Sequence, residues 1–438
     1  MRILVPIFRF NWYRTLAPVV DECMRRGHEV TCLHNESDRN FESNRPNEKL
    51  FPQFRHGTPK INGYRNDEEL DQAILYGNHE ALISIDLPLR RWIDDPRWAK
   101  RKFRYIAVTT PDTLKRLHDR ESVEAVDCFA LRSEYELSAT LLDRTTDYGQ
   151  IFETAQSLGR DGKRYTGFLE PRLGKEWTED LVEDFKEKVR ICGYPLLDAE
   201  ILIDREAVRK RLKIPEGQPV IGFWATPTAG RGSHASWDWL FSENRMPYFY
   251  AKAFKAYGLA GMGKRFVCEE KVVRAVYDFS RKNDAFLITK LRHYQKPGES
   301  LFSTFTDGVV GEDSYYPHTA LELASIADVM IGFTTSGTPE AVWAGSAVID
   351  INPPGSQREM LYQTLHFWDG MLDAPGVVWS KKAEDLVESL PQATLEDYRI
   401  DPIIARNYKS KYCGPEGASF SANVLDAVEE DIINSRSA

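Results

Sequence analysis

The stretch "IADVMIGFTTSGTPEAVWAG", residues 326–345, carries the strongest local signal of the fold. It begins with an apolar run that predicts a buried strand, and the run stops at the polar sequence Thr-Thr-Ser-Gly-Thr-Pro. Because hydroxyl residues are preferred at helix caps and proline in the first turn, we expect a helix to begin here, with Glu340 in its first turn. A buried strand that leads through a short turn into a helix is typical of parallel α/β sheets.

The same turn also suits an anion. The first N–H groups of a helix and the positive end of its dipole point into the preceding loop, and Gly337 allows a ligand to approach the backbone closely. Thr335, Ser336, Gly337 and Thr338 are therefore candidate phosphate-binding residues, and Glu340 is a candidate for the two hydroxyls of a ribose. A plain helix cap explains the same residues, and the local pattern does not decide between the two interpretations.

Similar strand signals recur along the whole chain and form two series. The first series comprises the apolar runs at residues 2–8, 29–34, 81–86, 104–110 and 127–133. The second comprises the runs at residues 219–228, 285–292, 329–335 and 346–352. Strands separated by helical crossovers predict parallel sheets. The predicted fold class is therefore α/β, with two Rossmann-like parallel-sheet domains that face a cleft, where ligands of such sheets bind.

A charged helical segment separates the two series and places the boundary within about residues 198–216. We predict an N-terminal acceptor domain over residues 1–205 and a C-terminal nucleotide-donor domain over residues 206–420. A last helix at residues 421–438 is expected to pack back on the N-terminal domain. The segment at residues 35–66 is polar and rich in asparagine, which predicts a long loop.

Composition limits the classes of protein that remain. The chain has 438 residues, 42% hydrophobic and 28% charged, which is typical of a globular protein with two domains. Its formal net charge of -9 disfavours nucleic acid as a partner. The six scattered cysteines lack the spacing of a metal site, which predicts buried thiols in a cytoplasmic protein.

One segment departs from the acidic average. The sequence "RRWIDDPRWAKRKFR", residues 90–104, combines cations with aromatic residues. It is either a solvated surface or a patch for an anionic membrane or acceptor polymer. The cations of this possible peripheral membrane contact are Arg90, Arg91, Lys100, Arg101, Lys102 and Arg104.

Two further segments of the second series carry candidate donor-binding residues. The strand "AFLITKLR" ends with Lys290 and Arg292, followed by His293, and two cations suit a diphosphate leaving group. The loop after "PVIGFW" supplies Thr226, Thr228 and Arg231. It matches neither GxGxxG nor a P-loop, which disfavours simple dehydrogenases and NTPases.

The first series supplies candidates for the acceptor side. The loop "IFRFNWYRT" follows the first strand and contributes the predicted acceptor-binding residues Arg9, Asn11, Tyr13 and Arg14. Asp86 ends the strand "ALISID" and is a candidate general base. The chain lacks DxD, HExxH and GxSxG motifs, so we expect neither a metal nor another cofactor, and the zinc and serine hydrolases are disfavoured.

Several of these segments together resemble the CDP-glycerol glycerophosphotransferase-like and capsule-polysaccharide transferase group of the GT-B superfamily. The element at residues 326–345 is also similar to the S-G-T-x-x-x-E of GT-B enzymes such as lipid A disaccharide synthase. The resemblance extends over residues 126–430 and rests on the order of "VDCFALRSEYEL", "VRICGYPLLD", "PVIGFWATPT", "LITKLRH", "IADVMIGFTTSGTPEAVWAG" and "NYKSKYCGPEGASFSANVLDAV".

The resemblance implies a metal-independent glycosyltransferase that moves a glycosyl group from a nucleotide-activated sugar to a hydroxyl acceptor, a saccharide or polymer of a bacterial surface glycan. Lys290 and Arg292 would bind the donor phosphates, and Asp86, His293 and Arg292 are the candidate catalytic residues. The histidine of the family's K-x-H strand falls on Arg292 here, which departs from a two-histidine mechanism.

Three alternatives stay open at this point. A CDP-glycerol-type polyol-phosphate transferase would use a different activated donor. A non-hydrolysing UDP-sugar 2-epimerase shares the fold and would convert its substrate without an acceptor. A non-catalytic sugar-nucleotide-binding protein would bind a donor tightly and turn nothing over.

Overall fold

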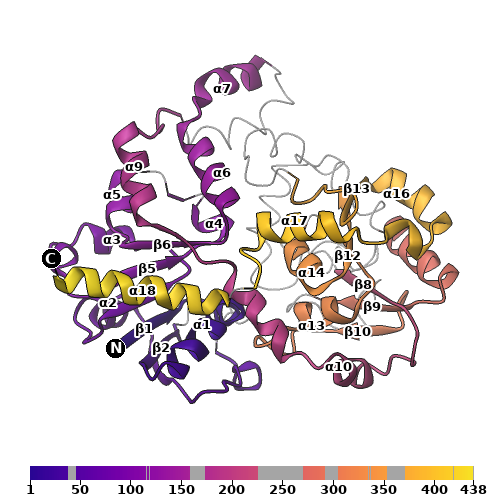
Figure 1. Ribbon diagram of the computed structural model, residues 1–438, viewed down its shortest axis with the longest axis horizontal. Helices are drawn as coiled ribbons and strands as arrows, with labels where there is room; N and C mark the ends of the chain where they lie inside the picture. Colours follow the sequence, from indigo (N-terminus) through magenta and orange to yellow (C-terminus); the bar gives the residue numbers. More distant parts are fainter. Residues whose placement is uncertain are drawn as a thin grey trace. The chain divides into compact units, whose positions relative to one another are not determined.

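The structure is a computed structural model, and it describes residues 1–37, 46–114, 116–117, 119–157, 173–224, 270–291, 304–333, 335, 337–352, 370–417 and 419–437. The described residues divide into two compact units (Figure 1). The first contains those within Met1–Ala199 and Ser410–Ala438, and the second contains those within residues 200–409. Each unit is built on its own sheet.

The first unit has a seven-stranded parallel sheet in the order β3-β2-β1-β4-β5-β6-β7. Its strands are β1 (Arg2–Ile7), β2 (Glu29–Asn35), β3 (Lys60–Tyr64), β4 (Ala81–Ser84), β5 (Arg104–Val108), β6 (Cys128–Leu131) and β7 (Val189–Ile191). Its helices are α1 (Tyr13–Arg25), α2 (Asp67–Leu75), α3 (Arg90–Ile93), α4 (Pro111–Leu114), α5 (Arg120–Glu124), α6 (Glu134–Thr145), α7 (Tyr148–Ser157), α9 (Glu179–Lys188) and α18 (Phe420–Ser437). The strand order reverses between β1 and β4, which marks the ligand-binding point of such sheets.

The C-terminal helix α18 closes one side of this sheet. It packs against α1, β5 and β6, as Figure 1 shows for the yellow helix that lies beside α1. Its inner face buries Phe420, Val424, Leu425 and Val428. The Nη1 atom of Arg26, just after α1, donates to carboxylates of α18, so residues at both ends of the chain stabilise one core.

The second unit has a six-stranded parallel sheet in the order β10-β9-β8-β11-β12-β13. Its strands are β8 (Val220–Trp224), β9 (Phe286–Lys290), β10 (Gly308–Val310), β11 (Val329–Gly332), β12 (Ala347–Asn352) and β13 (Val378–Lys382). Its helices include α10 (Arg205–Arg211), α13 (Thr319–Ile326), α14 (Thr338–Ala344), α16 (Ala383–Ser389) and most of α17 (Pro402–Tyr412). The order reverses between β8 and β11, as in a Rossmann sheet.

The prediction of two Rossmann-like parallel sheets is confirmed. The prediction that residues 35–66 form only a loop is wrong, because β3 pairs with β2 as an edge strand. Four of its five residues are exposed, so it lacks the apolar run that reveals a central strand. The short strands β7 and β10 and the charged strand β13 were missed for similar reasons.

Candidate functional site

The carboxyl edge of the second sheet brings several predicted site residues into one row. Trp224 at the end of β8 is level with Gly332 of β11 on one side and with Lys290 of β9 on the other. Gly332 is in turn level with Asp350 of β12. This row lies at the point between β8 and β11 where the strand order reverses, which is where α/β sheets bind ligands.

The turn after β11 is built around the indole of Trp224. A Cβ atom on Gly332 would lie 2.8 Å from Cε3 of Trp224, and one on Gly337 would lie 3.4 Å from its Cζ2. The two glycines therefore leave room for this ring. The hydroxyl of Thr335 accepts a hydrogen bond from the amide of Gly337 at 3.1 Å, and the hydroxyl of Thr338 donates to the carbonyl of Thr335 at 3.0 Å. Thr338 is fully buried, and its side chain stabilises the turn. This differs from the prediction that Thr338 contacts a phosphate.

Glu340, the predicted ribose ligand, lies in the first turn of α14 beside a histidine. Its Oε2 atom is 3.2 Å from Nε2 of His318, and the two side chains are 8% and 1% exposed. His318 immediately precedes α13, and α13 and α14 pack against each other. His318 was not among the predicted site residues, although a histidine directly before a strongly apolar helix was the available signal.

Lys290, the predicted phosphate ligand, also has a partner that was not predicted from the sequence. Its Nζ atom lies 3.0 Å from Oε2 of Glu312 and 3.1 Å from the carbonyl oxygen of Leu291. The side chains of Lys290 and Glu312 are 8% and 11% exposed. The positive charge of Lys290 is therefore already balanced by a carboxylate, which weakens its attraction for a phosphate.

Six predicted site residues lie outside the described residues. They are Thr226, Thr228, Arg231, Arg292, His293 and Ser336. Their roles in donor binding and, for Arg292 and His293, in catalysis stay predictions.

At the first unit's sheet, one predicted acceptor residue belongs to the core. Tyr13 is fully buried, and its hydroxyl lies 2.6 Å from Nε2 of His34. Burial raises the pKa of Tyr13 and lowers the pKa of His34 to about 4. The prediction that Tyr13 binds an acceptor is therefore wrong, because its side chain is the first buried position of α1 and faces the protein interior.

The other acceptor candidates remain near the carboxyl end of β1. Arg9 is exposed, and Arg14 is half-buried in the first turn of α1. The Oδ1 atom of Asn11 is buried and has no hydrogen-bond partner within the described part of the chain. These three residues lie beside the reversal point of the first sheet, and their role in acceptor binding stays a prediction.

Asp86 follows β4, the strand that neighbours β1. Its carboxylate forms an ion pair with Arg116, and its amide donates to Oγ of Ser84 at 3.1 Å. The pKa of Arg116 is lowered by burial and by the nearby charge of Arg9. Because the ion pair with Arg116 already engages the Asp86 carboxylate, this geometry weakens the assignment of Asp86 as general base.

The basic run does not form a continuous cationic patch. Trp92 and Trp98 are core residues, and the arginines of the run pair with carboxylates. The ion pairs are Arg90–Asp94, Arg91–Asp71, Arg97–Asp95, Arg101–Asp127 and Arg104–Asp431. Lys100 and Lys102 are exposed. Carboxylates therefore neutralise most of the positive charge on which the predicted contact with an anionic membrane depends.

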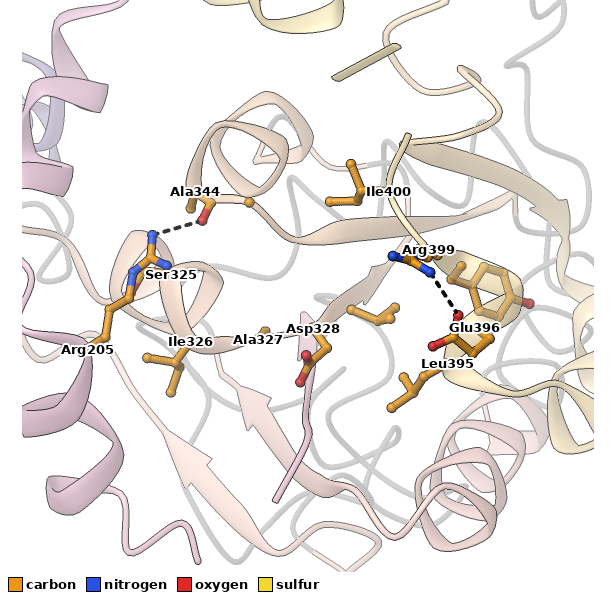
Figure 2. A pocket seen from close by; sticks show the side chains of 13 residues that line it. Arg205, Ser325, Ile326, Ala327, Asp328, Ala344, Leu395, Glu396, Arg399 and Ile400 are labelled. Carbon is orange, nitrogen blue, oxygen red and sulfur yellow. Dashed lines mark hydrogen bonds and ion pairs between the residues drawn. The ribbon is translucent and has the colours of Figure 1, made fainter. Parts of the chain in front are cut away.

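A cavity of about 660 Å³ lies at the other end of the second sheet. Figure 2 shows Arg205 on one side of it, bonded to a main-chain carbonyl at the end of α14, and Arg399 paired with Glu396 on the other. Asp328, which precedes β11, also lines it and accepts a hydrogen bond from the amide of Val220, the first residue of β8. The cavity is therefore at the amino ends of the strands, away from the row that contains Trp224.

The described ranges contain neither a metal-binding cluster nor a membrane-spanning helix. No cluster of three or more histidine, cysteine, aspartate or glutamate residues could hold a metal ion there. None of the helices in those ranges combines the length and the apolar character that crossing a membrane requires.

Comparison with known proteins gives similarity in structure only. No family model and no curated protein matches the sequence. The wall teichoic acid polymerase TagF matches with a TM-score of 0.56 and 12% identity, over 99% of this chain and 90% of that one. The UDP-GlcNAc 2-epimerase of Methanocaldococcus jannaschii matches with a TM-score of 0.50 and 10% identity, over 98% and 99%.

A plant protein belongs to the same group of neighbours. Arabidopsis thaliana UGT89C1, solved in complex with UDP-L-rhamnose, matches with a TM-score of 0.50 and 11% identity, over 98% of this chain and 99% of that one. These neighbours share one architecture of two Rossmann-like domains. Likeness at such low identity shows the fold alone, and it identifies the chain as a protein of the GT-B fold.

Proposed function

We propose that the chain is a metal-independent glycosyltransferase that binds a nucleotide-activated sugar at the second sheet and transfers the sugar to a hydroxyl acceptor of a bacterial surface glycan. One observation carries this proposal. The carboxylate of Glu340 is almost buried in the first turn of α14, 3.2 Å from Nε2 of His318 and next to the point where the strand order reverses. A carboxylate so placed suits the two hydroxyls of a ribose.

The remaining roles follow from position. The row of residues that contains Trp224 and Lys290 would line the donor site. The predicted Arg292 and Ser336 would complete the binding of the phosphates. A cationic environment stabilises the charge that develops on the leaving diphosphate. On the first unit, the exposed Arg9 and the Asp86–Arg116 pair would bind the acceptor, and Asp86 or His293 would take the proton of its hydroxyl.

The structural neighbours support a nucleotide-activated substrate. One was solved with UDP-L-rhamnose, one is named for UDP-GlcNAc, and TagF was soaked with CDPG. The epimerase among them keeps 2-epimerisation of a UDP-sugar as the second candidate function. TagF similarly keeps a CDP-glycerol-type transferase open.

A thermal-shift screen with UDP, CDP, CMP, GDP and ADP tests the donor site. A ligand at about 100 times its dissociation constant should stabilise the native protein by ~2.7 kcal/mol. Glu340→Gln should abolish most of that stabilisation. The proposal fails if none of the five nucleotides raises the melting temperature of the wild-type protein.

Product analysis then separates the enzyme classes. Conversion of a UDP-sugar to its 2-epimer without an acceptor would favour the epimerase. Transfer of a polyol phosphate from CDP-glycerol would favour that alternative, and tight binding without turnover would indicate a binding protein. Transfer that EDTA abolishes would contradict the metal-independent mechanism.

A further inference from the structure

The cavity at the amino ends of the second sheet has a chemistry that the proposed function does not use. Its volume of about 660 Å³ lies within the range of small-molecule sites. All of its lining residues belong to the second unit, and none of them is in the row that contains Trp224. A ligand of this cavity would therefore bind separately from a nucleotide at that row.

The arginines that line the cavity already have acidic partners. Arg205 pairs with Glu200 at 3.0 Å. Arg399 lies 3.8 Å from Glu396, and both of these side chains are more than four-fifths exposed, so they form a weak surface ion pair. The positive charges of the lining are thus balanced.

Asp328 differs from the other charged residues of the lining. Its Oδ2 atom accepts a hydrogen bond from the amide of Val220 at 2.8 Å, which fixes the position of the carboxylate. The residue is exposed to the cavity, and the described part of the chain supplies no ion pair for it. The negative charge of Asp328 is therefore uncompensated, and the cavity favours a positively charged ligand.

Two helix ends add to this preference. The helices α13 and α14 end at Ile326 and Ala344, and both residues line the cavity. The last carbonyl groups of a helix have no partner within it and form the negative end of its dipole. The guanidinium of Arg205 already donates to the carbonyl of Ala344 at 3.3 Å, so a cationic group of the protein itself binds at one of these ends.

Most of the remaining lining is apolar, which separates an organic cation from a metal ion. The apolar residues are Ile326, Ala327, Val329, Leu395 and Ile400. Such side chains pack well against methylene groups, whereas small divalent metal ions prefer several oxygen ligands and retain water. Figure 2 shows Asp328 between Arg205 and Glu396, so the lining offers two carboxylates, one central and one at the side.

We propose that this cavity binds an aliphatic diamine or polyamine. One ammonium group pairs with Asp328 beside the ends of α13 and α14, and the methylene chain lies against the apolar lining. A second ammonium group pairs with Glu396 in place of Arg399. An ammonium group has three donors, which suits a carboxylate surrounded by carbonyl oxygens. The proposal does not depend on the proposed function, because it requires no nucleotide.

Calorimetric titration with spermidine at physiological ionic strength tests the proposal. We expect one spermidine to bind per chain, and triethylene glycol, an uncharged chain of similar length, not to bind. Asp328→Asn should weaken spermidine binding by at least ~10-fold, because it removes a charge-assisted hydrogen bond. The asparagine keeps an oxygen that accepts the amide of Val220, so this variant should fold. Glu396→Gln should weaken binding by only about 2–5-fold, since Glu396 is exposed.

Glu388→Gln is the matched control. It removes the same charge at an exposed position of α16 in the same unit, outside the cavity lining, and it should keep the wild-type affinity. The proposal is wrong if wild-type protein does not bind spermidine, or if Asp328→Asn and Glu388→Gln bind it equally. Should Asp328→Asn fail to fold, equal binding by Glu396→Gln and Glu388→Gln overturns the proposal instead. Displacement of spermidine by an equal concentration of Mg²⁺ would also overturn it, because the site would then prefer a metal ion to an amine.

Discussion

The Nζ atom of Lys290 lies 3.0 Å from the Oε2 atom of Glu312, and both side chains are almost entirely buried at the carboxyl edge of the second sheet. A pair in this position has two possible roles. It can support the fold, because each buried charge neutralises the other, or it can hold Lys290 ready for an anionic ligand. The two roles respond differently to substitution.

Replacement of Glu312 by alanine should lower the free energy of unfolding by about 3–5 kcal/mol, because it leaves the buried ammonium without its partner. The double variant Lys290→Met/Glu312→Leu removes both charges and should restore stability to within about 1–2 kcal/mol of the wild-type value. Urea denaturation followed by tryptophan fluorescence measures both. A double variant as unstable as Glu312→Ala would show that the pair does not act through charge.

The same double variant separates structure from binding. If Lys290 contacts the donor phosphates, the stable double variant should lose at least ~10-fold in nucleotide affinity, since a charge-assisted hydrogen bond contributes about 1.5–3 kcal/mol. Unchanged affinity in a stable double variant would remove Lys290 from the donor site.

The contact between Gly193 and Phe420 gives a second prediction, for the first unit. Gly193 has a φ of +87°, and a Cβ atom there would overlap the ring of Phe420, which is fully buried at the start of α18. Gly27 has a φ of +77° and nothing within 4 Å of the added Cβ. Gly27→Ala should therefore cost about 1–2 kcal/mol for backbone conformation alone. Gly193→Ala should cost about 1–3 kcal/mol more, because it also overpacks the contact.

Urea denaturation of these two variants isolates the steric part, because the strained backbone conformation is common to both. Equal losses of stability would mean that α18 shifts freely and that Phe420 is not a fixed contact.

The central strands could be predicted because they are buried on both faces. The runs that became β1, β4 and β11 are almost continuously apolar, and turn residues bound them. The edge strand β3 exposes four of its five residues, and β13 contains two lysines, so neither has a hydrophobic pattern. Their pairing depends on the neighbouring strand, which one segment of sequence does not reveal.

The candidate site could be predicted only in part, for a related reason. The position of Lys290 at the carboxyl end of a strand, and of Glu340 in the first turn of a helix, follows from the strand and helix pattern. Their partners Glu312 and His318 come from the segment between β10 and α13, and only the tertiary fold brings them close. Tyr13 was misassigned because a tyrosine directly after a polar loop suits both a ligand contact and the first buried turn of a helix.

The cysteines give a third prediction. Cys23, Cys32, Cys128, Cys192 and Cys413 are buried thiols outside any disulfide. Burial raises the pKa of the Cys32 and Cys128 thiols to about 12, so almost no thiolate forms at neutral pH. Because Cys268 lies outside the described residues, the test uses Cys268→Ser. We expect DTNB at pH 8 to modify less than about one thiol per chain in the folded variant, because the thiolate is the reacting form. In denaturant all five remaining thiols should react. Rapid reaction of several thiols in the native protein would contradict this arrangement.

Stability should also fall as the pH is lowered from 7.5 to 5.0, because the buried His34 and the half-buried His79 are both neutral in the folded chain. Burial lowers the pKa of His79 from 6.5 to about 4, and its ring packs against Phe103 with 4.4 Å between the centroids. Between these values the unfolded chain binds a proton that the folded chain does not, so the free energy of unfolding decreases as the pH falls. The loss at pH 5.0 is about 2 kcal/mol for each such histidine, His34 being the other.

His79→Phe keeps the ring packing and removes the titration, so its loss between pH 7.5 and 5.0 should be about 2 kcal/mol smaller than that of the wild-type protein. Carboxylates lose most of their stabilising interactions below pH 5, so they contribute little to this difference. An identical pH dependence in His79→Phe and wild-type protein, measured by urea denaturation, would mean that His79 binds its proton as readily in the folded chain as in the unfolded one.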